Sequence, residues 1–271
     1  MAVKLFVSDL DGTLLPTGDE VSAKNIKAAQ DMSAAGITVT IATGRMYKAA
    51  LPVAKKLAVD VPIITYNGAL IKKVTGEVVY KNCLAPDIVL GVLDFCKKNN
   101  WYVQLYSRDE LYYAKSCAES HGYETAQKVA GHEVGAAGLR ERTEDVTKLL
   151  LITKGAEETA ARINKLQEHF ADKLNIVKSN ANYAEAVNPG VSKAAALKIL
   201  AEKLAVPIEE VMAIGDSDND LPMLKAAGKS IAMGNAAPHV KAACDFITES
   251  CDKDGFAAAV YKYVLSAEEN Q

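Results

Sequence analysis

The feature that most constrains the fold is an apolar run near the N-terminus that leads into two acids one residue apart. Residues 3–7 are typical of a buried parallel strand, and Asp9, Asp11 and Gly12 follow after a single serine. Alternate residues of an extended chain point to the same side, so we expect both carboxylates in one small site. Open α/β sheets bind their ligands at this carboxyl edge. The stretch therefore predicts an α/β fold with an acidic site.

Two neighbouring carboxylates can divide chemical work between them. One that a cation keeps ionised can act as a nucleophile, while one with a raised pKa can donate a proton to a leaving group. A surface turn is the alternative, because Asp and Gly are ordinary turn residues. A calcium-binding EF-hand loop does not fit, because Leu14 stands where that loop needs glycine and a strand precedes it.

Composition bounds the class of protein. With 271 residues, 49% hydrophobic and 24% charged, the chain predicts one large globular domain or two smaller ones. Its net charge of -3 offers no general attraction for nucleic acid or for an anionic membrane, so we expect neither partner. Five scattered cysteines disfavour a disulfide framework and a zinc site. Without a targeting segment or a long apolar run, we expect a reduced, cytoplasmic protein.

The first part of the chain alternates between predicted helices and strands. Ser22 is a plausible N-cap of a helix that Gly36 closes, and a strand over 37–42 follows. That strand ends in Thr43-Gly44-Arg45. A hydroxyl and backbone N–H groups before a helix suit a phosphoryl oxygen, although a simple threonine cap is the alternative. A strand over 61–66 then precedes a predicted hairpin with its turn at Thr75-Gly76.

The middle of the chain follows a different order. Its pattern predicts an α+β layer with an antiparallel sheet, and residues 116–145 are too weakly patterned to assign. The predicted elements are a helix over 87–98, strands over 101–106 and 111–114, a strand over 148–153, a helix over 157–170, and strands over 175–179 and 183–187.

The alternating pattern resumes after Asn188-Pro189-Gly190. Ser192 can cap a helix with Lys193 in its first turn, where a cation opposes the helix dipole and needs compensation. A solvated lysine on an amphipathic helix is the alternative. A strand over 211–214 then ends in a run, 216–220, with three acids within five residues. These acids repel one another unless a cation lies among them.

Four polar clusters therefore stand at predicted strand ends or at a helix start: Asp9 with Asp11, Thr43-Gly44-Arg45, Lys193, and Asp216 to Asp220. In this order they resemble the four motifs of the haloacid dehalogenase superfamily. The insertion between the second and third motifs resembles the C2-type α/β cap of its Cof-type sugar phosphatases, and so does Tyr66-Asn67-Gly68-Ala69. The resemblance implies a Rossmann-like parallel-sheet core over 1–83 and 188–271, with an inserted α+β cap over 84–187.

The resemblance also implies an activity, namely Mg²⁺-dependent hydrolysis of small phosphate monoesters, with sugar phosphates as the leading substrates. Asp9 would attack phosphorus and form an aspartyl-phosphate, and Asp11 would protonate the leaving oxygen and then activate water. The Asp9 carboxylate, the Asp11 carbonyl and Asp216 would hold Mg²⁺.

Further site residues follow from the same resemblance. Asp220 would orient water on the metal or pair with Lys193. Arg45 is a further candidate to pair with a carboxylate or to reach substrate, and Asn67 and Glu185 are further candidates because they lie near the two predicted domain junctions. A purely structural role is the alternative for each of the three. Phosphoryl oxygens would contact the Leu10 and Gly44 backbone, Thr43, Lys193 and Asn219.

Two other functions stay open at this point. One is phosphomutase-type phosphoryl transfer to a sugar, and the other is a non-catalytic module that binds a phosphorylated metabolite. The presence of Asp11, which proton transfer needs and binding does not, argues against the second. A monomer and a homodimer are both compatible with the sequence.

Overall fold

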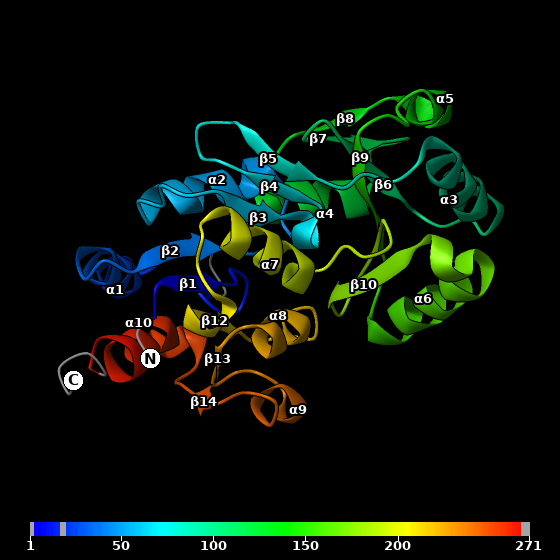
Figure 1. Ribbon diagram of the computed structural model, residues 1–271. Helices are drawn as coiled ribbons and strands as arrows, with labels where there is room; N and C mark the ends of the chain where they lie inside the picture. Colours follow the sequence, from blue (N-terminus) through cyan, green and yellow to red (C-terminus); the bar gives the residue numbers. More distant parts are fainter. Residues whose placement is uncertain (1–2, 17–19, 267–271) are drawn as a thin grey trace. The chain divides into compact units, whose positions relative to one another are not determined.

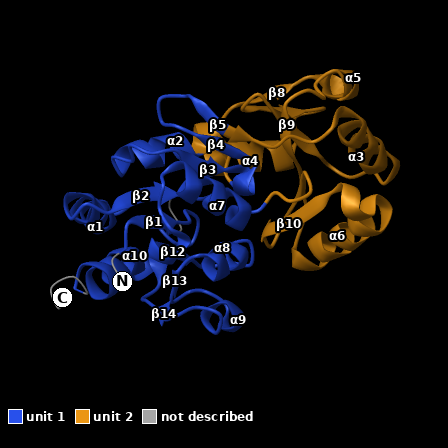
Figure 2. Ribbon diagram, viewed as in Figure 1, with its two compact units in different colours: residues 1–44, 50–79, 192–271 blue, residues 45–49, 80–191 orange. Residues whose placement is uncertain are grey.

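A computed structural model describes residues 3–16 and 20–266 (Figure 1). The chain divides into two compact units (Figure 2). Unit 1 takes its described residues from 1–44, 50–79 and 192–271, and unit 2 consists of 45–49 and 80–191. In the described part of the chain, every helix is too short or too polar to cross a lipid bilayer.

Unit 1 contains a five-stranded parallel sheet in the order β14-β13-β12-β1-β2. Its central strands are buried, as their continuous apolar sequences predict. Ser8 at the end of β1 lies opposite Ile41 of β2 and Ile214 of β12, so three neighbouring strands end at one level. The strands are β1 (Leu5–Ser8), β2 (Thr38–Ile41), β12 (Val211–Gly215), β13 (Lys229–Ala232) and β14 (Phe246–Ile247).

Helices lie on both sides of this sheet. Figure 1 shows α1 and α10, which contact each other, on one side, and α7 and α8, which also contact each other, on the other. The Ser22 side chain caps α1 by accepting a hydrogen bond from Asn25 N at 3.1 Å, so this prediction is confirmed. The helices are α1 (Ala23–Ala34), α2 (Tyr47–Lys56), α7 (Lys193–Lys203), α8 (Leu221–Ala226), α9 (Pro238–Lys241), α10 (Gly255–Ala259) and a final π-helical segment (Val260–Leu265).

A small second sheet contains the predicted hairpin. β3 (Ile63–Thr65) runs antiparallel to β4 (Leu70–Lys72), and β5 (Val78–Lys81) is the third strand. The turn between β4 and β5 closes where Gly76 N donates to Lys73 O at 2.9 Å, as the Thr75-Gly76 signal predicts. The boundary between the two units falls within β5.

Unit 2 contains a six-stranded sheet in the order β10-β11-β9-β6-β7-β8. Leu105, Leu149 and Leu151 of its central strands share one apolar core with Val92 of α3 and Leu166 of α6. The strands are β6 (Gln104–Ser107), β7 (Glu110–Tyr113), β8 (Gly131–Glu133), β9 (Val146–Ile152), β10 (Asn175–Asn180) and β11 (Tyr183–Val187), and the helices are α3 (Pro86–Lys98), α4 (Ala118–Gln127), α5 (Gly135–Arg140) and α6 (Ala156–Phe170).

Two expectations for this unit need correction. The sheet is mixed rather than antiparallel, because β8 runs parallel to β7. The unassigned stretch 116–145 forms α4, β8 and α5. The helix α4 is the crossover that a parallel pair requires. Its weak pattern has a physical cause, because it buries only Ser120 and Tyr123 and therefore shows little apolar periodicity.

The fold class is confirmed as α/β, with a parallel core sheet and a separate inserted α+β unit. The cap boundaries at 84 and 187 stay a prediction. The contact units place the divisions after residues 79 and 191 and add the segment 45–49 to unit 2.

Candidate active site

The carboxyl ends of three neighbouring strands bring distant parts of the sequence together. Asp9 and Asp216 come directly after β1 and β12, and Thr43 comes after β2 with one residue between them. Backbone hydrogen bonds extend the ladder beyond the strands, since Asp9 N donates to Ile214 O at 3.0 Å and Ala42 N donates to Ser8 O at 2.8 Å. These three site residues therefore share one edge of the core sheet.

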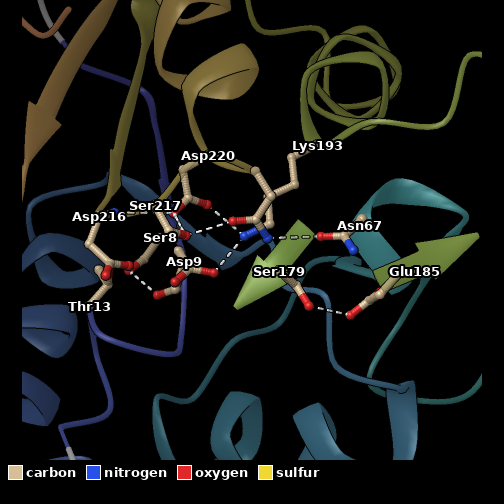
Figure 3. A network of polar contacts seen from close by, with 11 residues as sticks. Ser8, Asp9, Thr13, Asn67, Ser179, Glu185, Lys193, Asp216, Ser217 and Asp220 are labelled. Carbon is tan, nitrogen blue, oxygen red and sulfur yellow. Dashed lines mark hydrogen bonds and ion pairs between the residues drawn. The ribbon is translucent and has the colours of Figure 1, made fainter. Parts of the chain in front are cut away.

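Lys193, the first residue of α7, joins two acids of the site. Its Nζ donates to Asp9 Oδ1 and to Asp220 Oδ1, both at 2.6 Å (Figure 3). Ser192 fixes the start of α7 by accepting from Ala195 N at 3.1 Å, which places Lys193 in the first turn. The two carboxylates supply the compensation that a buried cation at a helix N-terminus requires.

Three acids gather around this lysine. Single carboxylate oxygens of Asp9, Asp216 and Asp220 lie within 4.8 Å of one another. Asp220 is also engaged by the backbone, because its Oδ2 accepts from Asp216 N at 3.1 Å and from Ser217 N at 3.0 Å. Asp216 accepts a long hydrogen bond from Thr13 Oγ1 at 3.4 Å. Asp220 is thus held by the protein through both of its oxygens.

The electrostatics of the cluster show an excess of negative charge. Burial raises the pKa of Asp9, and the neighbouring Asp220 raises it further, although Lys193 opposes the shift. Burial and Asp220 likewise raise the pKa of Asp216 to about 7. Burial lowers the pKa of Lys193, but Asp220 and Asp9 outweigh it and raise that pKa above its usual range. One ammonium does not neutralise three clustered acids, two of them buried, so the oxygen donors fit an additional cation.

Asp11 is placed differently from Asp9. The regular strand ends at Ser8, so the alternation that predicted both carboxylates on one side does not continue to Asp11. Asp9 is 4% exposed, whereas Asp11 is exposed. The loop turns back on itself through Gly12 N, which donates to Leu15 O at 3.0 Å. The Asp11 side chain is not one of the three acids whose oxygens lie within 4.8 Å of one another, although its charge adds to the burial that raises the pKa of Asp9 and of Asp216.

Asn67 links three loops of the site. Its backbone N donates to Thr43 O at 2.9 Å, and its Oδ1 accepts from Asn219 Nδ2 at 3.0 Å. A Cβ atom on Gly44 would lie 3.1 Å from the same Oδ1. Asn67 adopts a left-handed backbone with φ 55°, which asparagine tolerates better than most residues. The predicted residues Thr43, Gly44, Asn67 and Asn219 are thus mutually connected.

Arg45 and Glu185 belong to unit 2. Glu185 is buried and accepts hydrogen bonds from Lys148 Nζ at 3.0 Å and from Ser179 Oγ at 2.6 Å, the second of which is drawn in Figure 3. Both partners are residues of unit 2 as well. These hydrogen bonds of Glu185 therefore belong to the inserted unit itself.

Sequence reasoning missed Asn235. Its Nδ2 donates to Gly12 O at 2.9 Å and to Asp216 Oδ2 at 3.3 Å, and its Oδ1 accepts from Cys251 N at 2.9 Å. It therefore connects the loop after β1 with Asp216. A signal was present, because Asn235 follows β13, the strand next to β12, at the same edge of the sheet.

Comparison with known proteins gives the family. The sequence model of one protein family, the haloacid dehalogenase-like hydrolases, matches residues 6–260 of this chain. The chain belongs to the haloacid dehalogenase-like hydrolases. The assignment to this family is thereby confirmed, and so is the assignment to its phosphatases, because the relatives named below cover nearly the whole chain.

Three similar proteins illustrate the relationship. The 5-amino-6-(5-phospho-D-ribitylamino)uracil phosphatase YcsE of Bacillus subtilis is 32% identical, over 97% of this hydrolase and 96% of its own length. The crystal structure of a haloacid dehalogenase-like hydrolase from Bacteroides thetaiotaomicron is 32% identical, with a TM-score of 0.87 over 96% of this chain and 99% of that chain. The subclass IIB sugar phosphatase BT4131 shares the fold, with 24% identity and a TM-score of 0.83 over 96% and 99% of the two chains.

Proposed function

We propose that this hydrolase is a Mg²⁺-dependent phosphatase that acts on small phosphate monoesters through an aspartyl-phosphate at Asp9. The observation that carries the proposal is the bridge from Lys193 Nζ to Asp9 and Asp220, beside Asp216. Phosphate monoesters hydrolyse so slowly that enzymes accelerate the reaction by up to ~10²¹-fold. Positioning and neutralisation of charge provide most of this effect.

The residues of the chain suit both chemical steps. Lys193 holds Asp9 Oδ1 and leaves Oδ2 to attack phosphorus, while the bond from phosphorus to the leaving oxygen breaks and Asp11 donates a proton to that oxygen. In the second step Asp11 takes a proton from water, which attacks the aspartyl-phosphate and releases inorganic phosphate. Asp9 and Asp11 then return to their starting states.

Other groups would bind the transferring phosphoryl group. Lys193 supplies a positive charge, and Thr43 and Asn219 supply a hydroxyl and an amide at the same edge of the sheet. The backbone N–H groups of Leu10 and Gly44 complete the predicted set, and Asn67 positions Thr43 and Asn219 through its two hydrogen bonds.

The donor set fits Mg²⁺, which prefers oxygen ligands. The Asp9 and Asp216 carboxylates, with the Asp11 carbonyl, would hold the ion, and burial together with the charge of Asp220 raises the pKa of Asp216, which an added cation would counteract. When bound, the ion neutralises charge on the phosphoryl oxygens. Asp220, whose oxygens already accept from Lys193 and from backbone N–H groups, acts as a positioning residue.

Sugar phosphates and related esters are the substrate class that we favour. The relative YcsE is named for a substrate whose phosphate lies on a ribityl group, a chain derived from a sugar. The test is a panel of hexose, pentose and ribityl phosphates, with released inorganic phosphate measured in Mg²⁺ and in chelator. Turnover should require Mg²⁺ and should be fastest on the polyhydroxylated esters.

The Asp9→Asn variant tests the nucleophile. We expect kcat to fall by at least ~10⁴-fold, as is typical when the attacking residue is removed. Asp218→Asn is the matched control, because Asp218 is an exposed acid of the same 216–220 run and should leave kcat nearly unchanged. Full activity in Asp9→Asn, or a rate that chelation does not alter, would overturn the proposal. Isomerised hexose phosphate without free phosphate would indicate a mutase, and binding without turnover would indicate a binding module.

A further inference from the structure

A cavity lies wholly within unit 2. It encloses about 750 Å³, and every residue that lines it lies between Leu93 and Arg162. This volume is within the range of about 300 to 1,000 Å³ that is typical of small-molecule sites. None of the proposed catalytic or metal-binding residues lines the cavity, so the proposed phosphatase reaction does not explain it.

One part of the lining is apolar. Trp101 and Val103 lie just before β6, and Leu139 of α5 is buried; all three line the cavity. The Arg162 guanidinium lies 5.0 Å from the centre of the Trp101 ring, a favourable contact between a cation and an aromatic face. An aromatic ligand would therefore find apolar and aromatic surface here.

The polar part of the lining is positively charged, although the protein as a whole is negative. Two ion pairs, Arg140 with Asp94 and Arg162 with Glu158, contribute no net charge to the lining. The remaining charged groups are three lysines and one glutamate, which leave an excess of two positive charges. The charged residues that line the cavity are Asp94, Lys97, Lys115, Glu119, Arg140, Lys154, Glu158 and Arg162.

Arg162 supplies a further indication. Its Nε is buried and has no hydrogen-bond partner among the described residues. A buried donor without an acceptor is unfavourable. An acceptor oxygen on a ligand that reached Nε would satisfy this donor.

We propose that this cavity is a binding site for a small organic anion with an aromatic ring, formed by none of the residues proposed for catalysis. The ring would lie against the surface formed by Trp101, Val103 and Leu139. The anionic group would pair with Lys97 or Lys154, two of the lysines that give the lining its excess of positive charge. The proposal goes beyond the phosphatase activity and does not depend on it.

The single tryptophan of the protein makes the test direct, because Trp101 lines the cavity. The probe is 8-anilinonaphthalene-1-sulfonate, an anionic aromatic dye that fluoresces in apolar sites and accepts energy from tryptophan. We expect saturable quenching of Trp101 emission with one dye bound per chain. The neutral analogue N-phenyl-1-naphthylamine should bind more weakly, by about threefold to tenfold, because it lacks the sulfonate.

Two neighbouring alanines of α5 provide matched variants. Ala136 lines the cavity and Ala137 does not, and both are exposed, so both should tolerate phenylalanine without loss of folding. Ala136→Phe should lower the affinity for the dye by more than about tenfold, because the phenylalanine ring fills the site, and Ala137→Phe should leave the affinity unchanged. Lys97→Gln combined with Lys154→Gln should remove the preference for the anionic dye. Circular dichroism verifies that each variant is folded.

An independent variant separates this proposal from the proposed function. Asp9→Asn should bind the dye as the unaltered protein does, whether or not it retains phosphatase activity. Any of three results would overturn the proposal: dye binding that does not quench Trp101, equal affinity for Ala136→Phe and the unaltered protein, or equal affinity for the two dyes in the unaltered protein.

Discussion

At the scale of single residues, one ammonium group forms ion pairs with two of the three acids of the proposed active site. Lys193 is 1% exposed, and Asp9 and Asp220 both accept its protons. The sequence predicted that a cation in the first turn of this helix needs an anion, because the helix dipole alone is unfavourable there. It did not predict Asn235 or the exposure of Asp11, because both depend on how loops from different strands meet.

Removal of this charge should destabilise the protein when no metal is present. Lys193→Met leaves three clustered acids without a cation, and we expect the free energy of unfolding at pH 8 to fall by about 3 to 5 kcal/mol. Urea denaturation in chelator measures the change. Lys198→Met, an exposed lysine on the same helix, is the control and should be nearly neutral. Similar losses in both variants would show that the buried ion pairs contribute nothing special.

A glycine comparison isolates the contact between the loop after β1 and Asp216. Gly12 and Gly36 both have positive φ, 81° and 84°, so alanine should cost either site about 1 kcal/mol of stability. A Cβ on Gly12 would also lie 2.5 Å from Asp216 Oδ2, whereas a Cβ on Gly36 meets nothing within 4 Å.

We therefore expect Gly12→Ala to weaken the affinity for Mg²⁺ by at least about tenfold, since Asp216, a proposed metal ligand, must move. Gly36→Ala should lower the stability of the protein and leave its affinity for Mg²⁺ unchanged. Titration of phosphatase activity with Mg²⁺, beside urea denaturation, separates the two effects. An unchanged Mg²⁺ dependence in Gly12→Ala would contradict the assignment of Asp216 as a metal ligand.

At the scale of elements, helix caps place catalytic groups as well as stabilise helices. Ser192 caps α7 one residue before Lys193, and Ser22 caps α1 with a hydrogen bond of the same length, 3.1 Å. The helix α1 carries none of the predicted site residues. The same capping interaction therefore has a functional consequence in one helix and not in the other.

The serine-to-alanine change at each cap should separate these roles. Ser192→Ala and Ser22→Ala should each lower the free energy of unfolding by about 1 kcal/mol. Only Ser192→Ala should also lower kcat, by about tenfold, because the first turn of α7 positions Lys193. Chemical denaturation and steady-state kinetics provide both readouts. Equal kcat values in the two variants would contradict this role for the cap.

The strongly patterned elements could be predicted from the sequence, and the weakly patterned ones could not. Strands such as β1 and β12 can be recognised as continuous apolar runs in the sequence, because both of their faces are buried. The short strand β8 has two exposed residues of three, and α5 spans only six residues. Their conformation is set by tertiary contacts, such as the pairing of Tyr113 with Glu133, rather than by local periodicity.

At the scale of the whole molecule, the acid cluster links folding to pH. In the metal-free protein the pKa of Asp9 is raised and that of Asp216 is raised from 3.8 to about 7, in both cases mainly by burial. The folded state therefore binds protons more tightly than the unfolded chain does. The stability that these protons provide is fully present below the ordinary carboxyl pKa, and it is lost as pH rises through the raised values.

Mg²⁺ should compensate for this loss. Because the metal binds ionised carboxylates, we expect it to raise the melting temperature more at pH 8 than at pH 5.5. Thermal unfolding in Mg²⁺ and in chelator at both pH values measures the effect. Asp216→Asn should show a smaller dependence of metal-free stability on pH and little response to Mg²⁺. A larger Mg²⁺ effect at pH 5.5 would contradict the linkage.

The pairing of β1 with β12 has a consequence for the synthesis of the protein. While the chain emerges from the ribosome, β1 has no β12 beside it until residue 215 has been made. The stretch 80–191, which forms nearly all of unit 2, is translated before that point. Asp9 likewise has neither Lys193 nor Asp216 beside it until they are made, so a prematurely terminated chain that lacks them has an incomplete central sheet and cannot assemble the proposed catalytic centre.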